Sequence, residues 1–321
     1  MPETIRKELI GHRQISSTTI YGLPSIGLGL LGTGVGIFYI FVGLGLIPAS
    51  DSKFHGPKIA VASIGVVFLL CGLPFFINGL FSIWRKKKLK RSLAKYTSEP
   101  WRTDYHWDSK GIRDENLKIV IKNFLKLFSF IIILVPFNWF ALNDSVFMIF
   151  VIFFDLVFLG ITLGYAIYTL IRFIKYGTTY LRFSKFPYFL GEKMRVYFTN
   201  TKPIKHLQDL KATIRFIEEC YETRKTTETN SSVVVSYQLY AETVSLKNLS
   251  LFEQDGLSIP IEFQLPEGDY STCLNRRPPR YWELEITGLT FGVNFSAAFF
   301  LPIYAKVLNE NSSKSNKTLG Q

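Results

Sequence analysis

The residue whose type and position most directly suggest chemistry is Asp155, an acid within an apolar run. It lies nine residues after Val146 in the run from Val146 to Ile171, which contains no other charge. In a helix this places the carboxylate about 13 Å inside the run. A charge at that depth in a membrane costs about 2.5–3.5 kcal/mol, so Asp155 should face other helices. The position predicts either ion or proton handling, or a protonated, hydrogen-bonded contact between helices.

A stripe of lysines at the start of the third apolar run could bind an anion. Lys118, Lys122 and Lys126 recur every four residues and therefore share one face of a helix. One interpretation is that these side chains extend towards the cytoplasmic membrane surface. The alternative is a lipid-phosphate or ligand site in which Lys122 and Lys126 make the contacts.

A second basic group follows the second apolar run and consists of Arg85, Lys86, Lys87 and Lys88. Such a run next to a membrane span is typical of a signal that holds the flank in the cytoplasm. It also predicts contacts with anionic lipid headgroups, each contributing about 1 kcal/mol near the surface.

The segment after this basic group combines aromatic and acidic residues: Trp101, Asp104, Tyr105, Trp107 and Asp108. Aromatic rings near a membrane surface favour an interfacial anchor, so we expect a fixed interfacial hairpin. The two carboxylates are expected to form local ion pairs with nearby Lys and Arg. The alternative interpretation is the mouth of a ligand site.

The remaining sequence offers no catalytic or metal-binding pattern. The four histidines are far apart, and no nucleophile elbow, zinc-protease motif or phosphate-binding loop occurs. Glu283 and Glu285 lie two residues apart on a predicted strand, where we expect a solvent-exposed face. We therefore expect no enzyme, no metal and no cofactor.

The first apolar run contains Gly27, Gly29 and Gly32, which match G-x-G-x-x-G. No strand precedes them, so a dinucleotide site is rejected. The small residues instead indicate a smooth helical face for close packing, either within the chain or between copies in a homo-oligomer. That face comprises Ser25, Gly29, Gly32, Gly36 and Gly43.

Composition and apolar runs favour a membrane protein. The 321 residues are 48% hydrophobic, with a net charge of +12 and a mean hydropathy of +0.18. Each of four runs exceeds the roughly 20 residues that cross a bilayer as a helix. These numbers exclude a largely disordered chain, and three cysteines are too few for a disulfide scaffold. The predicted spans are 25–47, 59–83, 119–142 and 146–171.

Positive charge predicts the orientation of the spans. Lys and Arg are concentrated in the N-terminal tail 1–24, in the predicted basic loop 84–118 and directly after the fourth span. By the positive-inside rule, both termini lie in the cytoplasm, and the helices 25–175 span the inner membrane. Because membrane topology accounts for the net charge, nucleic acid is not an expected partner.

After residue 176 the hydrophobic runs shorten and alternate, which is typical of strands. In the run from Tyr281 to Gly288, for example, Trp282, Leu284 and Ile286 should face inward. Seven such runs predict an antiparallel β-sandwich over residues 176–308, followed by a disordered tail at 309–321. The expected fold class is therefore a four-helix transmembrane bundle followed by a cytosolic β-sandwich. The other runs are 178–183, 193–199, 211–220, 232–246, 257–264 and 293–301.

Several motifs together resemble a known group of proteins. Residues 99–112 contain P-W, D-W and G-x-I elements, residues 175–183 form a post-membrane strand, and residues 281–286 and 292–304 form a closing strand pair. They are similar to an uncharacterised bacterial family of multi-span membrane proteins, a domain-of-unknown-function type. The resemblance implies an architecture with an arrestin-like or immunoglobulin-like C-terminal sandwich, and it implies no activity.

Three functional hypotheses follow. The first is a non-enzymatic membrane-anchored scaffold whose sandwich binds a cytosolic protein by its surface or edges. The second is a transporter, channel-like or lipid-handling protein that uses Asp155 and the Lys122/Lys126 stripe. The third is a membrane enzyme that uses the loop from Trp101 to Asp108 at the membrane interface.

Overall fold

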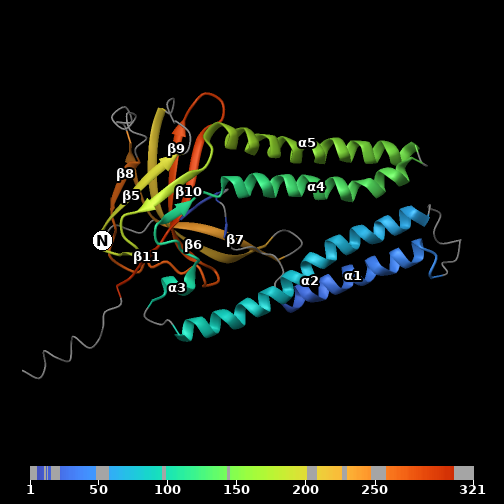
Figure 1. Cartoon of the computed structure of the whole chain (residues 1–321), viewed down its shortest axis with the longest axis horizontal. Helices are drawn as coiled ribbons and strands as arrows, with labels where there is room; N and C mark the ends of the chain where they lie inside the picture. The colour runs from blue at the N-terminus through green and yellow to red at the C-terminus, as the bar shows by residue number, and fades with distance from the viewer. Residues whose placement is uncertain are drawn as a thin grey trace, which may run out of the picture. The chain divides into compact units, whose positions relative to one another are not determined.

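The computed structural model describes residues 6–10, 12, 14–15, 22–47, 58–95, 99–142, 145–200, 208–225, 230–246 and 258–306. The chain forms two compact units, whose elements are labelled in Figure 1. A helical unit comprises residues 19–91 and 115–174, and a β-rich unit comprises residues 1–18, 92–114 and 175–321. The predicted disordered tail at 309–321 lies outside the described residues.

Four long helices occupy the four predicted spans. They are α1 (Leu23–Gly43), α2 (Lys58–Lys95), α4 (Asn116–Ala141) and α5 (Ser145–Tyr176). Each is long and apolar enough to cross a membrane. The predicted apolar helices are therefore confirmed.

Helices α1 and α2 pack through glycines on both sides of their contact. A Cβ atom added at Gly36 would lie 2.7 Å from the carbonyl oxygen of Gly65, and one added at Gly65 would lie 2.6 Å from that of Gly36. A Cβ at Gly32 would lie 3.1 Å from the Cα of Gly72. Only glycine permits such an approach of two backbones. The predicted face of Gly29, Gly32 and Gly36 thus packs against α2 within the chain, and a homo-oligomer through this face stays a prediction.

Helices α4 and α5 are joined by polar and aromatic pairs instead. The buried Asn123 donates from Nδ2 to Oγ1 of Thr169 at 3.3 Å. The rings of Phe130 and Phe158 lie 5.9 Å apart. In apolar surroundings such a side-chain hydrogen bond contributes roughly 0.6–2 kcal/mol to helix association.

The predicted basic loop 84–118 is not a single loop. Helix α2 continues to Lys95, so the basic run at residues 85–88 lies within helix. A short helix, α3 (Trp101–Asp104), follows, and then strand β2 (Gly111–Arg113), which pairs with β3. Periodicity did not reveal these elements because both are too short to show a repeat.

The β-rich unit contains the seven predicted strands and several short ones. The seven are β3 (Thr179–Phe183), β5 (Lys193–Asn200), β6 (Gln208–Lys225), β7 (Asn230–Ser245), β8 (Ile259–Gln264), β9 (Arg280–Leu289) and β10 (Phe295–Leu301). The sheet orders are β1-β7-β6-β9-β10 and β2-β3-β5-β8, and all of these pairs are antiparallel. The two-residue strands β4 (Tyr188–Phe189) and β11 (Ile303–Tyr304) pair in parallel.

Both larger sheets contribute to one hydrophobic cluster. From β9, Trp282, Leu284 and Ile286 are fully buried in it, as the alternation predicts. The expectation for the opposite face was wrong at Glu283, which is only 5% exposed. Its Oε2 atom lies 3.7 Å from Nε2 of His12. Glu285 pairs with Arg215 at 2.5 Å.

The N-terminal segment explains the burial of Glu283, because it belongs to the β-rich unit. Strand β1 (Lys7–Glu8) pairs with β7. Further along, the backbone N–H of Ile15 donates to Oε1 of the fully buried Glu219 at 2.6 Å. The segment predicted as a separate tail at 1–24 is therefore partly folded into this unit, although its sequence shows no strand-like alternation.

The glycine contact between α1 and α2 predicts a contrast between two neighbouring positions. Gly36→Ala inserts a methyl group between two backbones and should destabilise the helical unit by about 1–3 kcal/mol. Gly34→Ala is the matched control, because a Cβ there meets nothing within 4 Å. We expect thermal unfolding in mild detergent to show a lower midpoint for Gly36→Ala alone. Equal midpoints for both variants would contradict this packing.

Candidate functional site

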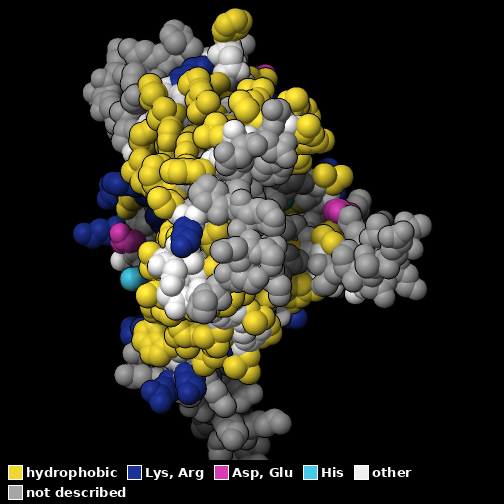
Figure 2. Space-filling view, turned by 90° about the vertical axis from the view of Figure 1, so that its right-hand side faces the viewer, with side chains coloured by type: hydrophobic (Ala, Val, Ile, Leu, Met, Phe, Trp, Pro, Cys, Tyr) yellow, Lys and Arg dark blue, Asp and Glu magenta, His cyan; other side chains and the backbone are white. Residues whose placement is uncertain are grey.

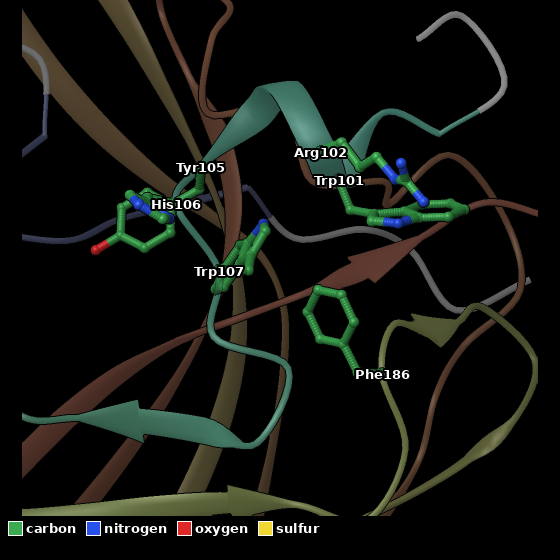
Figure 3. A pocket seen from close by; sticks show the side chains of 6 residues that line it. All are labelled: Trp101, Arg102, Tyr105, His106, Trp107 and Phe186. Carbon is green, nitrogen blue, oxygen red and sulfur yellow. The ribbon is translucent and has the colours of Figure 1, made fainter.

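The aromatic and acidic segment at residues 99–108 begins with one helical turn. Pro100, with φ −59°, precedes α3 and already has a helical backbone conformation. Its carbonyl oxygen accepts hydrogen bonds from the N–H groups of Thr103 at 3.1 Å and Asp104 at 3.0 Å. This turn fixes the spacing of the side chains that follow, which Figure 3 shows from close by.

Asp104 is the polar centre of this segment and is 8% exposed. Its Oδ1 accepts the backbone N–H of Asn275 at 2.8 Å, and its Oδ2 accepts the hydroxyl of Tyr304 at 3.2 Å. The oxygen of Tyr304 in turn accepts Nε1–H of Trp107 at 2.9 Å. This chain of hydrogen bonds ties the segment to the loop before β9 and to β11.

Burial sets the protonation behaviour of this network. Desolvation raises the pKa of the Asp104 carboxyl, and hydrogen bonds from Asn275 and Tyr304 partly oppose it. Desolvation and the nearby Asp104 charge raise the pKa of Tyr304, so its hydroxyl stays protonated as a donor. Because the folded-state pKa of Asp104 is raised, the folded chain binds this proton more tightly than the unfolded chain. The stabilisation from protonation of Asp104 is therefore present at low pH and lost as pH rises through the folded-state pKa.

The aromatic side chains of the segment pack on the β-rich unit. Trp101 meets the rings of Tyr304 at 5.9 Å and Phe189 at 6.1 Å, edge to face. The ring centroid of Tyr105 lies 4.7 Å from that of Trp107 and 6.1 Å from that of Phe300. These rings thus contact strands of the β-rich unit, and the interfacial hairpin stays a prediction.

Among the described residues, the two carboxylates accept neutral donors in place of the expected ion pairs. Asp104 accepts the neutral donors described above. Asp108 closes a turn, in which its Oδ1 accepts the backbone N–H of Lys110 at 2.9 Å. Asp104 therefore positions the segment, whereas Asp108 shapes an exposed turn.

A hollow of about 340 Å³ lies beside this network and opens to solvent. Figure 3 shows the rings of Trp101, Trp107 and Phe186 around it. The guanidinium of Arg102 is held by Glu99 at 2.5 Å. Flat rings beside a cation favour stacking on a ligand rather than covalent chemistry. The six residues that line the hollow are Trp101, Arg102, Tyr105, His106, Trp107 and Phe186.

Asp155 has a partner on the neighbouring helix. Nδ2 of Asn138 donates to Oδ2 of Asp155 at 2.7 Å and links α4 to α5. Oδ1 of Asp155 is buried and has no hydrogen-bond partner among the described residues. The hydrogen bond agrees with the interhelical-contact interpretation. The apolar run that holds Asn138 also contains Asn123, so the sequence does not single out the partner of Asp155.

The basic candidates remain accessible. Arg85, Lys86, Lys87 and Lys88 are exposed on the last part of α2. Lys122 and Lys126 are exposed on α4. Nothing in the described part of the chain joins these two groups into one site, and no cluster of metal-ligand residues occurs there.

Comparison with solved structures gives distant structural similarities. One of them is to Spo0M, a sporulation control protein from Bacillus subtilis, with 13% identity over 44% of this chain and a TM-score of 0.25. The similarity spans about half of that protein, 55% of its length. No protein-family model matches the chain, and no curated protein matches it in sequence. The resemblance to a family of uncharacterised membrane proteins therefore stays a prediction.

The network around Asp104 predicts different effects for the two acids of the segment. Asp104→Ala leaves the buried hydroxyl of Tyr304 and the N–H of Asn275 without their acceptor, which should cost about 1–3 kcal/mol. Asp108→Ala, at an exposed turn, should cost much less. Thermal unfolding of both variants in mild detergent, followed by tryptophan fluorescence, measures the difference. A loss of stability for Asp108→Ala as large as that for Asp104→Ala would contradict the structural role assigned to Asp104.

Proposed function

We propose that this chain is a multi-pass protein of the inner membrane whose four helices anchor a cytoplasmic β-sandwich. The sandwich acts as a non-enzymatic module that binds a protein partner. The helices provide attachment, and the β-rich unit provides recognition.

The apolar surface of the helices supports insertion into a bilayer. Leu156 is 72% exposed and Ile149 is 70% exposed. Figure 2 shows apolar side chains over much of the described surface, with only scattered charges. In water each exposed side chain of this size would forgo about 1.5–3 kcal/mol of burial energy. A bilayer removes that cost because its interior is apolar.

The path of the chain is the observation that carries the proposal. The β-rich unit is assembled from three segments, and each gap between them is filled by two long helices. The first segment joins through the pairing of β1 with β7, and the second through the pairing of β2 with β3. Segments that fold together must lie on the same side of a membrane. An even number of crossings between them satisfies this requirement.

Positive charge then selects the side. The exposed run at residues 85–88 lies in the last part of α2, shortly before the second segment, and Lys175 lies in the last turn of α5, at the start of the third. The positive-inside rule assigns such flanks to the cytoplasm. The same side chains are then placed to contact anionic lipids, as are Lys122 and Lys126 near the start of α4.

The edges of the sheets suit a protein partner. Strand β7 has 16 residues, and β1 pairs with Gln238 and Tyr237 of it. The N–H of Leu9 and the side chain of Gln14 also donate to the carbonyl oxygens of Ser236 and Val234 in β7. Edge strands present unpaired backbone groups that an extended segment of another protein can bind. We therefore propose that a protein partner binds at an edge of the sandwich. This binding needs neither a nucleic acid nor a cofactor.

Site-specific labelling tests the proposed topology. In a cysteine-free chain we expect a membrane-impermeant maleimide to label Ser52→Cys, in the connection between α1 and α2, from outside intact spheroplasts. Lys87→Cys and Ser109→Cys should react only after permeabilisation, because they belong to the cytoplasmic side. Labelling of residue 87 or residue 109 from outside would overturn the proposed orientation.

The alternative of a transporter is favoured by one observation, the buried Oδ1 of Asp155 without a partner. Asp155→Asn separates the two functions, because it removes the ionisable group and retains an acceptor for Asn138. Under the anchor proposal, this variant should keep the thermal midpoint of the wild type and match its proton and cation flux in liposomes. If wild-type liposomes conduct and Asp155→Asn liposomes do not, while both proteins are folded, the transporter function is favoured.

A further inference from the structure

The turn between β9 and β10 displays an apolar side chain entirely outside the protein. Phe291 is 101% exposed and Leu289 is 54% exposed, whereas the strands on either side are largely buried. Gly292 has φ +84°, a conformation that favours glycine and allows the sharp turn. The N–H of Thr290 donates to Oδ1 of Asn294 at 3.3 Å and closes the turn. This conformation keeps Leu289 and Phe291, which form the tip of the turn, away from the core.

The turn is attached to the last turn of α5. Nζ of Lys175 donates to the carbonyl oxygens of Phe291 at 2.9 Å and of Val293 at 3.4 Å. The hydroxyl of Tyr176 donates to the same Val293 oxygen at 2.5 Å. The ring of Tyr176 also packs on Phe295 at 5.2 Å. These contacts fix the tip beside the point where α5 ends.

The end of α5 marks a definite depth if the helix spans the bilayer. Lys175 lies four residues after Ile171, the last residue of the apolar run. At 1.5 Å per residue it is therefore about 6 Å beyond the run, at the level of the headgroups. Arg172 and Lys175 at this level are suited to anionic lipids. A turn that is hydrogen-bonded to Lys175 lies at the same level.

We propose that the tip formed by Leu289 and Phe291 inserts into the cytoplasmic headgroup and acyl boundary of the bilayer. This inference rests on the proposed function, since it requires α5 to cross the membrane. Burial of a phenylalanine side chain in an apolar layer is favourable, and lipid is the apolar phase next to Lys175. The β-rich unit would then contact the membrane through its own side chains as well as through the chain connections.

Spin labelling of the full chain tests this insertion. Cys71, Cys220 and Cys273 are replaced by serine, and a nitroxide is attached to Phe291→Cys in bilayers of phosphatidylcholine and phosphatidylglycerol. Because residue 291 is fully exposed, the substitution leaves the core unchanged. We expect collisions of the label with oxygen, which concentrates in lipid, to exceed those with a water-soluble nickel complex several-fold.

Two control positions keep this inference separate from the proposed function. Tyr221 is 44% exposed on β6 and lies ten residues beyond Lys211, about 33 Å along the strand. Since Lys211 pairs with Thr287 near the tip, a label at Tyr221→Cys should favour the nickel complex. A label on the exposed residue Leu156 of α5, attached to Leu156→Cys, reports whether α5 lies in lipid.

The outcomes are distinct. Lipid exposure at both 156 and 291 supports the insertion. Lipid exposure at 156 with water exposure at 291 overturns the insertion and leaves the proposed anchor intact. Water exposure at 156 overturns the anchor and the insertion together. A label at 291 that is shielded from both reagents would indicate a protein partner or second copy on the tip and would also overturn the insertion.

Discussion

The structure depends on one constraint, that three separated segments of the chain must meet in a single folded unit. Residues 1–18, 92–114 and 175–321 form the β-rich unit, and each interruption is a pair of long apolar helices. A chain that leaves such a unit has to return to it. Two antiparallel helices achieve this return, so the helical pairs and the assembly of the β-rich unit depend on each other.

The segments meet through strand pairs, aromatic packing and buried polar contacts. The carboxylate of Asp104 binds the N–H of Asn275 and the hydroxyl of Tyr304. Asp114, also buried, accepts the hydroxyl of Thr179 at 2.7 Å. A buried acceptor of this kind is costly to leave unpaired, so each contact strongly favours one arrangement of the segments. The specificity of assembly comes from such contacts, while the shared hydrophobic cluster supplies most of the stability.

The two helical pairs solve the problem of association in apolar surroundings differently. Helices α1 and α2 use glycines, which let the backbones approach and gain close van der Waals contact. Helices α4 and α5 use side-chain hydrogen bonds, Asn123 to Thr169 and Asn138 to Asp155. The hydrophobic effect provides little drive between helices within lipid, so one of these two devices is needed in each pair. The hydrogen bond from Asn138 makes Asp155 part of the contact between α4 and α5.

The sequence alone determined the elements whose signal is long or periodic. Four apolar runs predicted four helices, and alternation predicted seven strands, including the inward face of Trp282, Leu284 and Ile286. These features follow from local patterns, because burial of one face repeats with the period of the helix or strand. The glycine face of α1 was also predictable, since small residues at helical spacing permit only close packing.

Tertiary structure alone decided which distant residues meet. No local pattern indicates that Asp104 binds Tyr304, that the N-terminal segment covers Glu283, or that Lys175 holds the turn at Phe291. A hydrogen bond between residues far apart in sequence depends on the folded path of the chain, which hydropathy and spacing do not encode. The acidic and aromatic segment was therefore recognisable as unusual from its residues, but its role as a joint became definite only when the strands it contacts were in place.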